Sequence, residues 1–283
     1  MASNNSIHIS IVAEKVTDFL GLEISNAMLG SSLVIALLFI LGIYIRTQLK
    51  PKNVIPSKPQ LFMESTYQFL ESVTSQSAGE HRTRKYLGLV IVLFFYIIFG
   101  SWFGLLPGIL QIGFNEILDG KEAFIPLFRA PTTDLNATTA LALVAFGSIQ
   151  YAGFSELGFK GYVGKFFNFT HAGTFVLGML ELVFEFVRIV SFSFRLFGNI
   201  FAGEVLLAVI GFLSTIKLGF LPADFATVQL PFSSLVIVME FFVALIQAYV
   251  FINLMTVFIS VAADPHDHDE KHEELRNELG VSN

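Results

Sequence analysis

Long apolar runs alternate with shorter polar segments along most of the 283 residues. A helix needs about 20 apolar residues to cross the hydrocarbon core of a membrane. Residues 24–45 contain no charge and predict a first crossing, and residues 86–106 and 135–155 predict a second and a third. A helical stretch at 61–76, in polar surroundings, predicts an interfacial helix. We expect the first run to be retained, because no basic stretch of a signal peptide precedes it.

Two apolar segments near the carboxyl end are too long for an upright crossing. Residues 174–213 contain no proline, and residues 231–263 open at Pro231 and repeat the pattern. A helix of about forty residues would extend about 60 Å, twice the ~30 Å hydrocarbon core. Such helices have to tilt strongly, bend or lie nearly flat. The remaining segments predict a loop at 107–134 and a short connector at 159–172.

The composition favours an all-α membrane protein with about five membrane-crossing helices. The chain is 54% hydrophobic and 14% charged, whereas soluble domains carry about 25% charged residues. The absence of cysteine excludes a disulfide framework and a Cys-ligated metal site. No Gly-rich phosphate-binding loop ending in Lys-Ser/Thr is present, so ATP chemistry in this chain is not expected. We expect one membrane domain over residues 1–283, without a cofactor, and an acidic tail at 264–283.

Basic residues are distributed unequally between the two sides that five crossings would define. One side would receive Arg46, Lys50, Lys52, Lys58, Arg82, Arg84, Lys85, Lys160, Lys165, Lys271 and Arg276, and the other Lys15, Lys121, Arg129 and Lys217. Lysine and arginine concentrate in cytoplasmic loops. The richer side also holds the carboxyl terminus, which we therefore predict to be cytoplasmic.

Ionisable side chains lie inside the two overlong segments, where charge is expensive. The guanidinium of Arg195 stays protonated, and holding it in hydrocarbon costs from ~3 to more than ~10 kcal/mol. At about 100° per residue, one helix face carries Glu181, Glu185, Arg188, Arg195 and Asn199. Within this set, Glu185 and Arg188 could neutralise each other as an ion pair.

Two further carboxyl groups stand apart from that face. Glu204 lies on another face of the same predicted helix, and Glu240 shares a face with Gln247 on the last helix. Neither carboxyl has an obvious basic partner in the sequence. A low-dielectric medium favours the protonated form of a carboxyl group, so such a group can exchange a proton. Because chains of such groups along membrane helices mark proton relays, we favour a relay over a packing role.

The segment around Arg195 carries a specific sequence motif. Residues 193–199, Ser-Phe-Arg-Leu-Phe-Gly-Asn, followed by Ala202-Gly203-Glu204, resemble the signature of subunit a of F-type ATP synthases. Weaker segments agree in order and spacing: residues 104–108 are similar to a helix end of that family, 131–138 to its loop-to-helix motif and 240–249 to its last helix. The resemblance implies a proton-channel stator subunit that is itself non-catalytic.

The resemblance also implies roles for individual residues. Arg195 would face a rotating ring of c subunits, with Asn199 one turn later and Gln247 near it on the last helix. Glu204 and Glu240 would line the half-channel on the positively charged side of the membrane, although the family varies at the Glu240 position. A ring carboxylate would be loaded through this half-channel and unloaded on meeting Arg195.

Three further residues receive weaker implications from the same resemblance. Glu181 would match a carboxylate of the opposite, cytoplasmic half-channel. Asp134 and Asn136 would lie near the outer access path, although Asp134 fits a helix N-cap equally well. Ile189 stands where bacterial relatives often have proline, so the kink of those relatives is not carried over.

The implied partners are the c-subunit ring, the b subunits of the peripheral stalk and membrane lipid, in a hetero-oligomeric ATP synthase; no nucleic acid partner is expected. The expected location is a bacterial plasma membrane, with an organellar inner membrane or a thylakoid as alternatives, and the ion could be H⁺ or Na⁺. The rival function is a proton-coupled secondary transporter, but such folds usually show internal repeats, and none is visible. The tail histidines His266, His268 and His272 could bind metal, but a solvated tail is favoured, so no metal site is expected.

Overall fold

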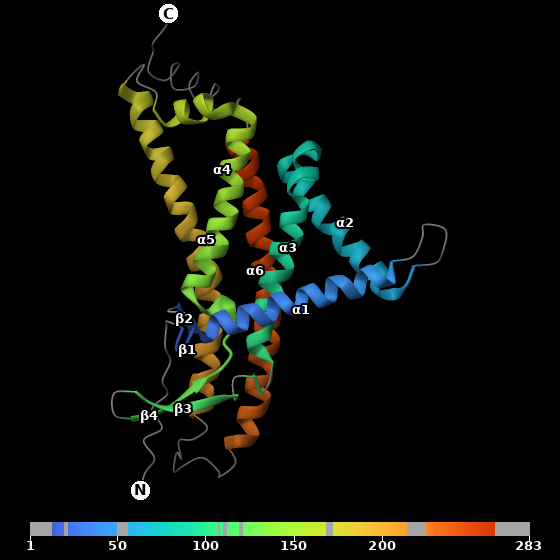
Figure 1. Cartoon of the computed structure of the whole chain (residues 1–283), viewed down its shortest axis with the longest axis vertical. Coiled ribbons are helices and arrows are strands. Elements are labelled where there is room, and N and C mark those ends of the chain that lie inside the picture. Colours follow the sequence, from blue (N-terminus) through green and yellow to red (C-terminus); the bar gives the residue numbers. More distant parts are fainter. Residues whose placement is uncertain are drawn as a thin grey trace, which may run out of the picture. The chain divides into compact units, whose positions relative to one another are not determined.

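The computed structural model describes residues 13–19, 22–49, 56–106, 108–109, 112–118, 121–167, 172–213 and 225–263. Its helices are α1 (Asn26–Gln48), α2 (Lys58–Ala78), α3 (Glu80–Leu105), α4 (Leu135–Phe166), α5 (Ala172–Leu213) and α6 (Phe225–Ala263), with a short 3-10 turn η2 (Pro131–Thr133) before α4 (Figure 1). Two antiparallel hairpins pair β1 (Lys15–Phe19) with β2 (Leu22–Ser25), and β3 (Gly113–Leu118) with β4 (Lys121–Pro126). The predicted all-α fold is confirmed, with the hairpins as small additions.

Four segments of the described chain are long and apolar enough to cross a membrane. They are Asn26–Gln48, Lys58–Leu105, Leu135–Gly164 and Pro231–Ala263. The fifth expected crossing, on α5, is not among them, and this helix carries the ionisable side chains discussed above. The chain is thus a membrane protein by helix length and composition, and the number of its crossings stays a prediction.

The last two helices are as long as their apolar patterns suggested. Helix α5 has 42 residues and α6 has 39, about twice the ~20 that an upright crossing requires. The sequence predicts that the last helix opens at Pro231, but it begins at Phe225 and includes that proline. Proline lacks an N–H group, so only one hydrogen bond is lost, near the amino end of the helix.

Two connecting segments contain secondary structure where the sequence predicted loops. The loop predicted at 107–134 contains the β3–β4 hairpin, in which Gly113 pairs with Pro126 and Leu118 with Lys121. An Asp-Gly pair between two runs that contain Ile and Phe favours a hairpin, so the sequence did carry a signal for this structure. The connector predicted at 159–172 is also wrong in part, because α4 continues to Phe166. The helix axis breaks at Gly158, whose φ of 70° suits glycine.

The backbone packs as two compact units. Unit 1 comprises residues 1–63, 92–138 and 194–249, and unit 2 comprises residues 64–91, 139–193 and 250–283. Several helices contribute to both, because α2, α3, α4, α5 and α6 each have residues in the two units.

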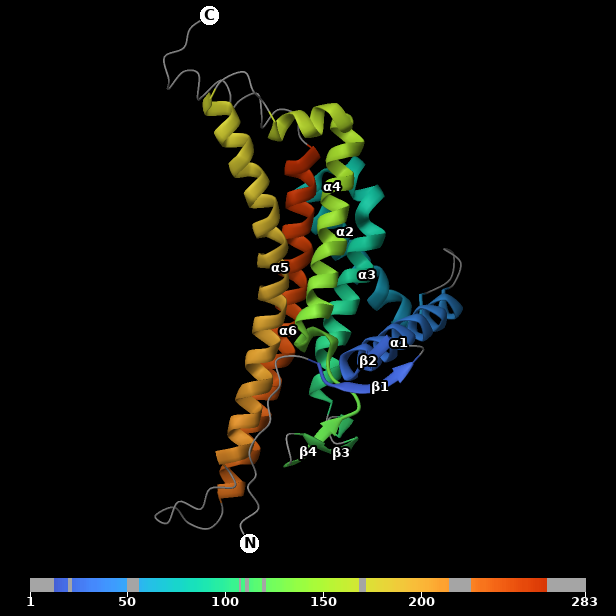
Figure 2. The ribbon, with the colours of Figure 1, turned by 60° about the vertical axis from the view of Figure 1, so that its left-hand side comes forward.

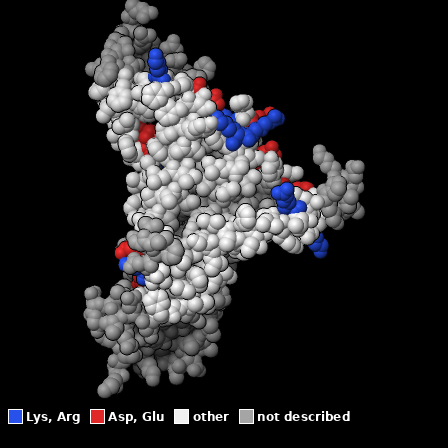
Figure 3. Space-filling view, viewed as in Figure 1, with Lys and Arg blue, Asp and Glu red and all other residues white. Residues whose placement is uncertain are grey.

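In unit 1, α1 packs against the second half of α3. The Ser31 hydroxyl and the Tyr96 hydroxyl lie 2.6 Å apart, and Val34 is fully buried. On the opposite side of α1, Phe39 is 71% and Ile40 63% exposed, and Figure 3 shows the surface over this helix as almost entirely uncharged. An apolar exposed face of this length suits contact with lipid.

In unit 2, the start of α3 holds the end of α6. The Arg82 guanidinium donates to the Ala263 carbonyl at 3.1 Å, where the helix leaves carbonyls without intrahelical partners. Further along, Ser77 of α2 donates to Asn253 Oδ1 at 3.2 Å. These polar contacts fix the carboxyl end of α6 against the α2–α3 corner.

Candidate functional site

Helices α5 and α6 meet through polar side chains in unit 1, where the two helices lie side by side in both ribbon views (Figures 1 and 2). Asn199 Nδ2 donates to Gln247 Oε1 at 2.7 Å. Gln247 is 4% exposed, so its amide would lack water as a substitute partner. The two residues are 48 positions apart in the sequence, and the packing of α5 against α6 brings them together.

Arg195 lies one helical turn before Asn199 on α5. Its neighbours show how the helix is turned: Phe194 is 56% exposed, whereas Leu196 is fully buried. Arg195 itself is only partly exposed. Arg195 is therefore at the edge between the packed and the open faces of α5, one turn before the residue that bonds Gln247. A permanent positive charge at such an edge can act on a group that approaches from outside the chain.

One turn beyond Asn199, α5 and α6 approach each other more closely. The Glu240 carboxylate lies so near to Gly203 that a Cβ atom at position 203 would overlap both of its oxygens. Glu240 is 4% exposed. Only glycine at position 203 leaves room for this carboxylate between the helices. Gly203 directly precedes Glu204 in the sequence, so the Glu240 carboxylate lies beside the backbone next to Glu204.

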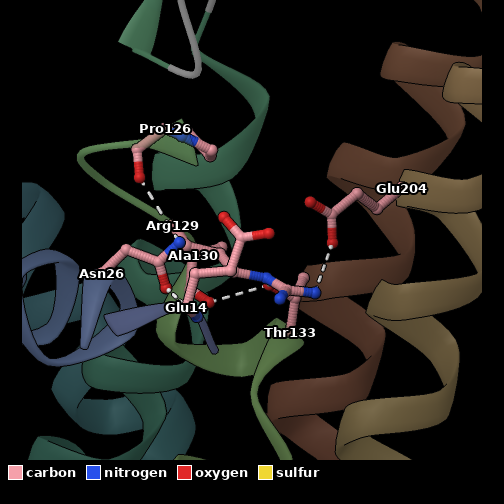
Figure 4. A network of polar contacts seen from close by, with 7 residues as sticks. All are labelled: Glu14, Asn26, Pro126, Arg129, Ala130, Thr133 and Glu204. Atoms are coloured by element: carbon pink, nitrogen blue, oxygen red, sulfur yellow. Dashed lines mark hydrogen bonds and ion pairs between the residues drawn. The ribbon is translucent and has the colours of Figure 1, made fainter. Parts of the chain in front are cut away.

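Glu204 has a basic partner, which corrects the expectation that it has none. Arg129 Nη2 donates to Glu204 Oε2 at 3.5 Å, and the two side chains are 6% and 30% exposed (Figure 4). The arginine precedes α4 and lies 75 positions away in the sequence. Such distant pairs leave no local signal, and Arg129 was considered only for the charge balance of the loops. Glu204 is therefore half of an ion pair, with its other side open toward solvent or lipid.

Arg129 is held by contacts within its own segment and with the start of α1. Its Nε donates to Thr133 Oγ1 at 3.1 Å, and that hydroxyl donates to the Ala130 carbonyl at 2.9 Å (Figure 4). Its main-chain N–H donates to the carbonyl of Asn26 at 3.4 Å. Its own carbonyl fills the space beside Gly30, where a Cβ atom would collide with it. The first turn of α1 thereby supports the arginine.

Asn26 joins this network to both hairpins. Its side-chain amide donates to the Pro126 carbonyl at 3.3 Å and accepts from the Glu14 N–H at 3.2 Å. Asn26 is 1% exposed and opens α1. The two hairpins and the start of α1 therefore converge on the segment that carries Arg129.

The two other candidates of this region differ from each other. Asp134 is 5% exposed, directly precedes α4 in extended conformation (φ −109°, ψ 127°), and so occupies the N-cap position. Its Oδ1 is buried without a hydrogen-bond partner among the described residues. Asn136 is exposed in the first turn of α4. The Asp134 carboxylate is thus a second buried acid of unit 1, and the fold leaves Asn136 outside this group.

Unit 2 contains a separate polar cluster on the first half of α5. Glu185 accepts from Arg188 Nη1 at 2.6 Å and from Gln150 Nε2 at 3.0 Å. Gln150 in turn accepts from the Tyr162 hydroxyl at 2.8 Å. The predicted ion pair of Glu185 with Arg188 is confirmed, but its partners on α4 were not foreseen. Glu181 lies one turn earlier on the same helix and is partly buried.

Metal binding has no support in the described part of the chain. No group of three or more His, Asp or Glu side chains there could hold a metal ion. The tail histidines fall outside the described residues. The chemistry that unit 1 offers is therefore that of acids and a fixed positive charge. It contains a carboxylate between two helices, an ion pair at their edge, and an arginine about two turns earlier on α5.

Comparison with known proteins agrees with the motif around Arg195. Residues 28–260 match the model of the family described as ATP synthase A chain. The chain is also similar to a protein named ATP synthase subunit a from Gloeobacter violaceus, with 32% identity over 218 residues, which cover 77% of this chain and 76% of the relative.

Proposed function

Because the chain belongs to the ATP synthase A chain family, we propose that it loads and unloads the carboxylates of a rotating c-ring through two half-channels. The family places it in the membrane sector of an ATP synthase, in ATP synthesis and proton transport. The observation that carries the finer proposal is the arrangement in unit 1, where Asn199 and Gln247 bond across the helices one turn from Arg195.

The entry path runs past Glu204 and Glu240. Both carboxyl groups belong to the stretch where α5 and α6 are in contact, and Glu240 lies against Gly203. Arg129 forms an ion pair with Glu204, and the 30% exposed side chain of Glu204 leaves its carboxylate accessible to an arriving proton. The buried Asp134 contributes to the outer part of the path, with Asn136 at its surface.

The exit path leads past Glu181 in the first half of α5. Arg195 separates it from the entry path, since a permanent cation repels a proton and favours the ionised form of a ring carboxylate that comes close. The released proton leaves near Glu181. Each proton that falls through 100 mV releases about 2.3 kcal/mol, which rotation transmits to the catalytic head.

The proposed partners follow from this cycle. The c-ring faces Arg195 and the open side of α5, and the b subunits of the peripheral stalk keep the chain from rotating with the ring. The excess of basic residues on one side supports a cytoplasmic carboxyl terminus, and the proposed location is a bacterial plasma membrane. Helices α5 and α6 are strongly tilted, because upright helices of this length would expose apolar side chains to water.

The test removes the charge at position 195. Arg195→Ala should abolish ATP-driven proton pumping and proton-driven synthesis in inverted vesicles, and Arg195→Lys should restore little, because an ammonium is more strongly hydrated and lacks the planar fork. Arg84→Ala, at an exposed position of α3, is the matched control and should pump normally. The amount of co-purified c-ring shows whether each variant assembles. Normal coupled pumping by Arg195→Ala would refute the proposal, and transport by the full chain alone in liposomes would favour the rival transporter.

A further inference from the structure

The only tryptophan of the chain lies beside the Glu240 site. Trp102 is near the end of α3, and its ring stacks on that of Phe241, with 3.9 Å between the ring centroids and 10° between the planes. Its indole N–H donates to the main-chain carbonyl of Phe241 at 3.2 Å. Two contacts of different kinds thus join α3 to the residue that follows Glu240.

The hydrogen bond acts on the backbone of α6 as well as on a side chain. A helix carbonyl keeps a second lone pair after it has accepted its helical hydrogen bond, so it can receive the indole N–H in addition. In hydrocarbon no water can replace such a partner, so the bond is held tightly. Trp102 therefore opposes both the rotation of α6 about its axis and its sliding at position 241.

Rotation of α6 would move the Glu240 carboxylate directly. Outer side-chain atoms stand about 5–6 Å from a helix axis, so a turn of ~20° displaces them by about 2 Å. The carboxylate lies against Gly203 with no space for a methyl group, and a shift of that size would change its contacts entirely. A contact that prevents rotation of α6 is therefore needed to keep the Glu240 carboxylate in position.

The same end of α3 also packs on the segment that carries the partner of Glu204. A Cβ atom at Gly104 would stand 2.7 Å from the Ala130 Cβ, and Ala130 adjoins Arg129. Helix α3 thus contacts the support of Glu204 through Gly104 and the support of Glu240 through Trp102. One helix end lies against both structures that position the two carboxylates.

We propose that Trp102 is a positioning residue for Glu240, which sets the rotation of α6 and thereby aligns the carboxylates at 240 and 204. The proposal rests on the entry path proposed above, and no role of Trp102 follows from the sequence motifs. Phenylalanine at this position keeps a stacking ring but loses the N–H donor, and leucine loses both. The two variants therefore separate the two contacts.

The assay is proton-driven ATP synthesis by the whole complex in liposomes, as a function of the proton concentration on the entry side. Trp102→Leu should raise the proton concentration for half-maximal synthesis about tenfold, and Trp102→Phe about threefold. The maximal rate should stay within about twofold of that of the unchanged complex, because a higher proton concentration compensates for a poorly positioned entry group. Phe154→Leu, which removes a stacked ring from unit 2, is the control and should leave that concentration unchanged.

Glu240→Gln calibrates the experiment. If this change leaves the half-maximal proton concentration where it was, the proposed entry path is wrong whatever Trp102 does. If Glu240→Gln raises it, then Trp102→Leu combined with Glu240→Gln should be no worse than Glu240→Gln alone, because both act on one group. Additive effects, or no effect of Trp102→Leu, would overturn the role of Trp102. So would failure of both Trp102 variants to co-purify with the c-ring, because the residue would then serve assembly.

Discussion

Gly203→Ala tests the contact on which the entry path depends. The added methyl group would overlap Oε1, Cδ and Oε2 of Glu240, so that rotating the carboxylate about its own bond cannot relieve the collision. The whole side chain, or α6 itself, has to move. Inserting a methyl group into a packed site costs about 1–3 kcal/mol, and alanine in a helix gains ~0.5–1 kcal/mol over glycine.

Alanine stays in the helix in either arrangement of Glu240, so its helix propensity cancels. The collision alone therefore favours the displaced arrangement by about 1–3 kcal/mol, which corresponds to a factor of about 5–140 in population. We therefore expect proton-driven ATP synthesis and ATP-driven pumping to slow by a similar factor. The assay is pumping by inverted vesicles, normalised to the amount of assembled complex. Gly211→Ala is the matched control, because it adds the same methyl group to the same helix with nothing within 4 Å of the new atom.

A second change examines the cause of the effect. Glu240→Asp shortens the side chain by one methylene group and should restore part of the rate in the Gly203→Ala background. If Gly203→Ala and Gly211→Ala pump equally well, the close contact between Gly203 and Glu240 has no part in proton transfer. If Gly203→Ala is slow but Glu240→Asp restores nothing, the damage lies in helix packing and not in the carboxylate.

Three further outcomes follow from the polar contacts. Arg129→Gln should lower the stability of the complex, measured by thermal unfolding. Because Glu204 is 30% exposed, the loss should be smaller than the ~3–5 kcal/mol of a broken, fully buried pair. Adding Glu204→Gln should recover part of the loss, and purely additive effects of the two changes would mean that the pair contributes nothing to stability. Glu204→Gln and Glu240→Gln should each slow pumping, the first more strongly, and the double variant should cost less than the product of the two effects; cysteines placed there, in a chain without native cysteine, should react with a hydrophilic thiol reagent from the side opposite the carboxyl terminus. Gln150→Leu should destabilise the complex by about 1.5–3 kcal/mol, the contribution of a hydrogen bond to a charged group, and pumping should continue. Loss of pumping without loss of stability would instead place the polar cluster of Glu185, Arg188 and Gln150 on the exit path.

The helices could be predicted because their signals are local. A long, mostly apolar run forms a helix whatever surrounds it, so that α1, α5 and the body of α6 lie within a few residues of the patterns in the sequence. The motif around Arg195 likewise identified the family, which the comparisons confirmed. The β3–β4 hairpin and the extension of α4 beyond Gly158 were missed, because turn chemistry was given less weight than apolar length.

The candidate residues were named by the sequence, but their partners were decided by the fold. Asn199 and Gln247 were both expected near Arg195, whereas their bond at 2.7 Å depends on the packing of α5 against α6. Arg129, Gln150 and Trp102 were not recognised at all as partners of Glu204, of Glu185 and of the turn that carries Glu240. Periodicity and composition describe neighbours along one helix, and a contact across 75 positions is set by how helices pack. The sequence alone therefore determined which charges lie in the apolar helices, and only the tertiary structure decided which of them are paired, because pairing depends on distance in space.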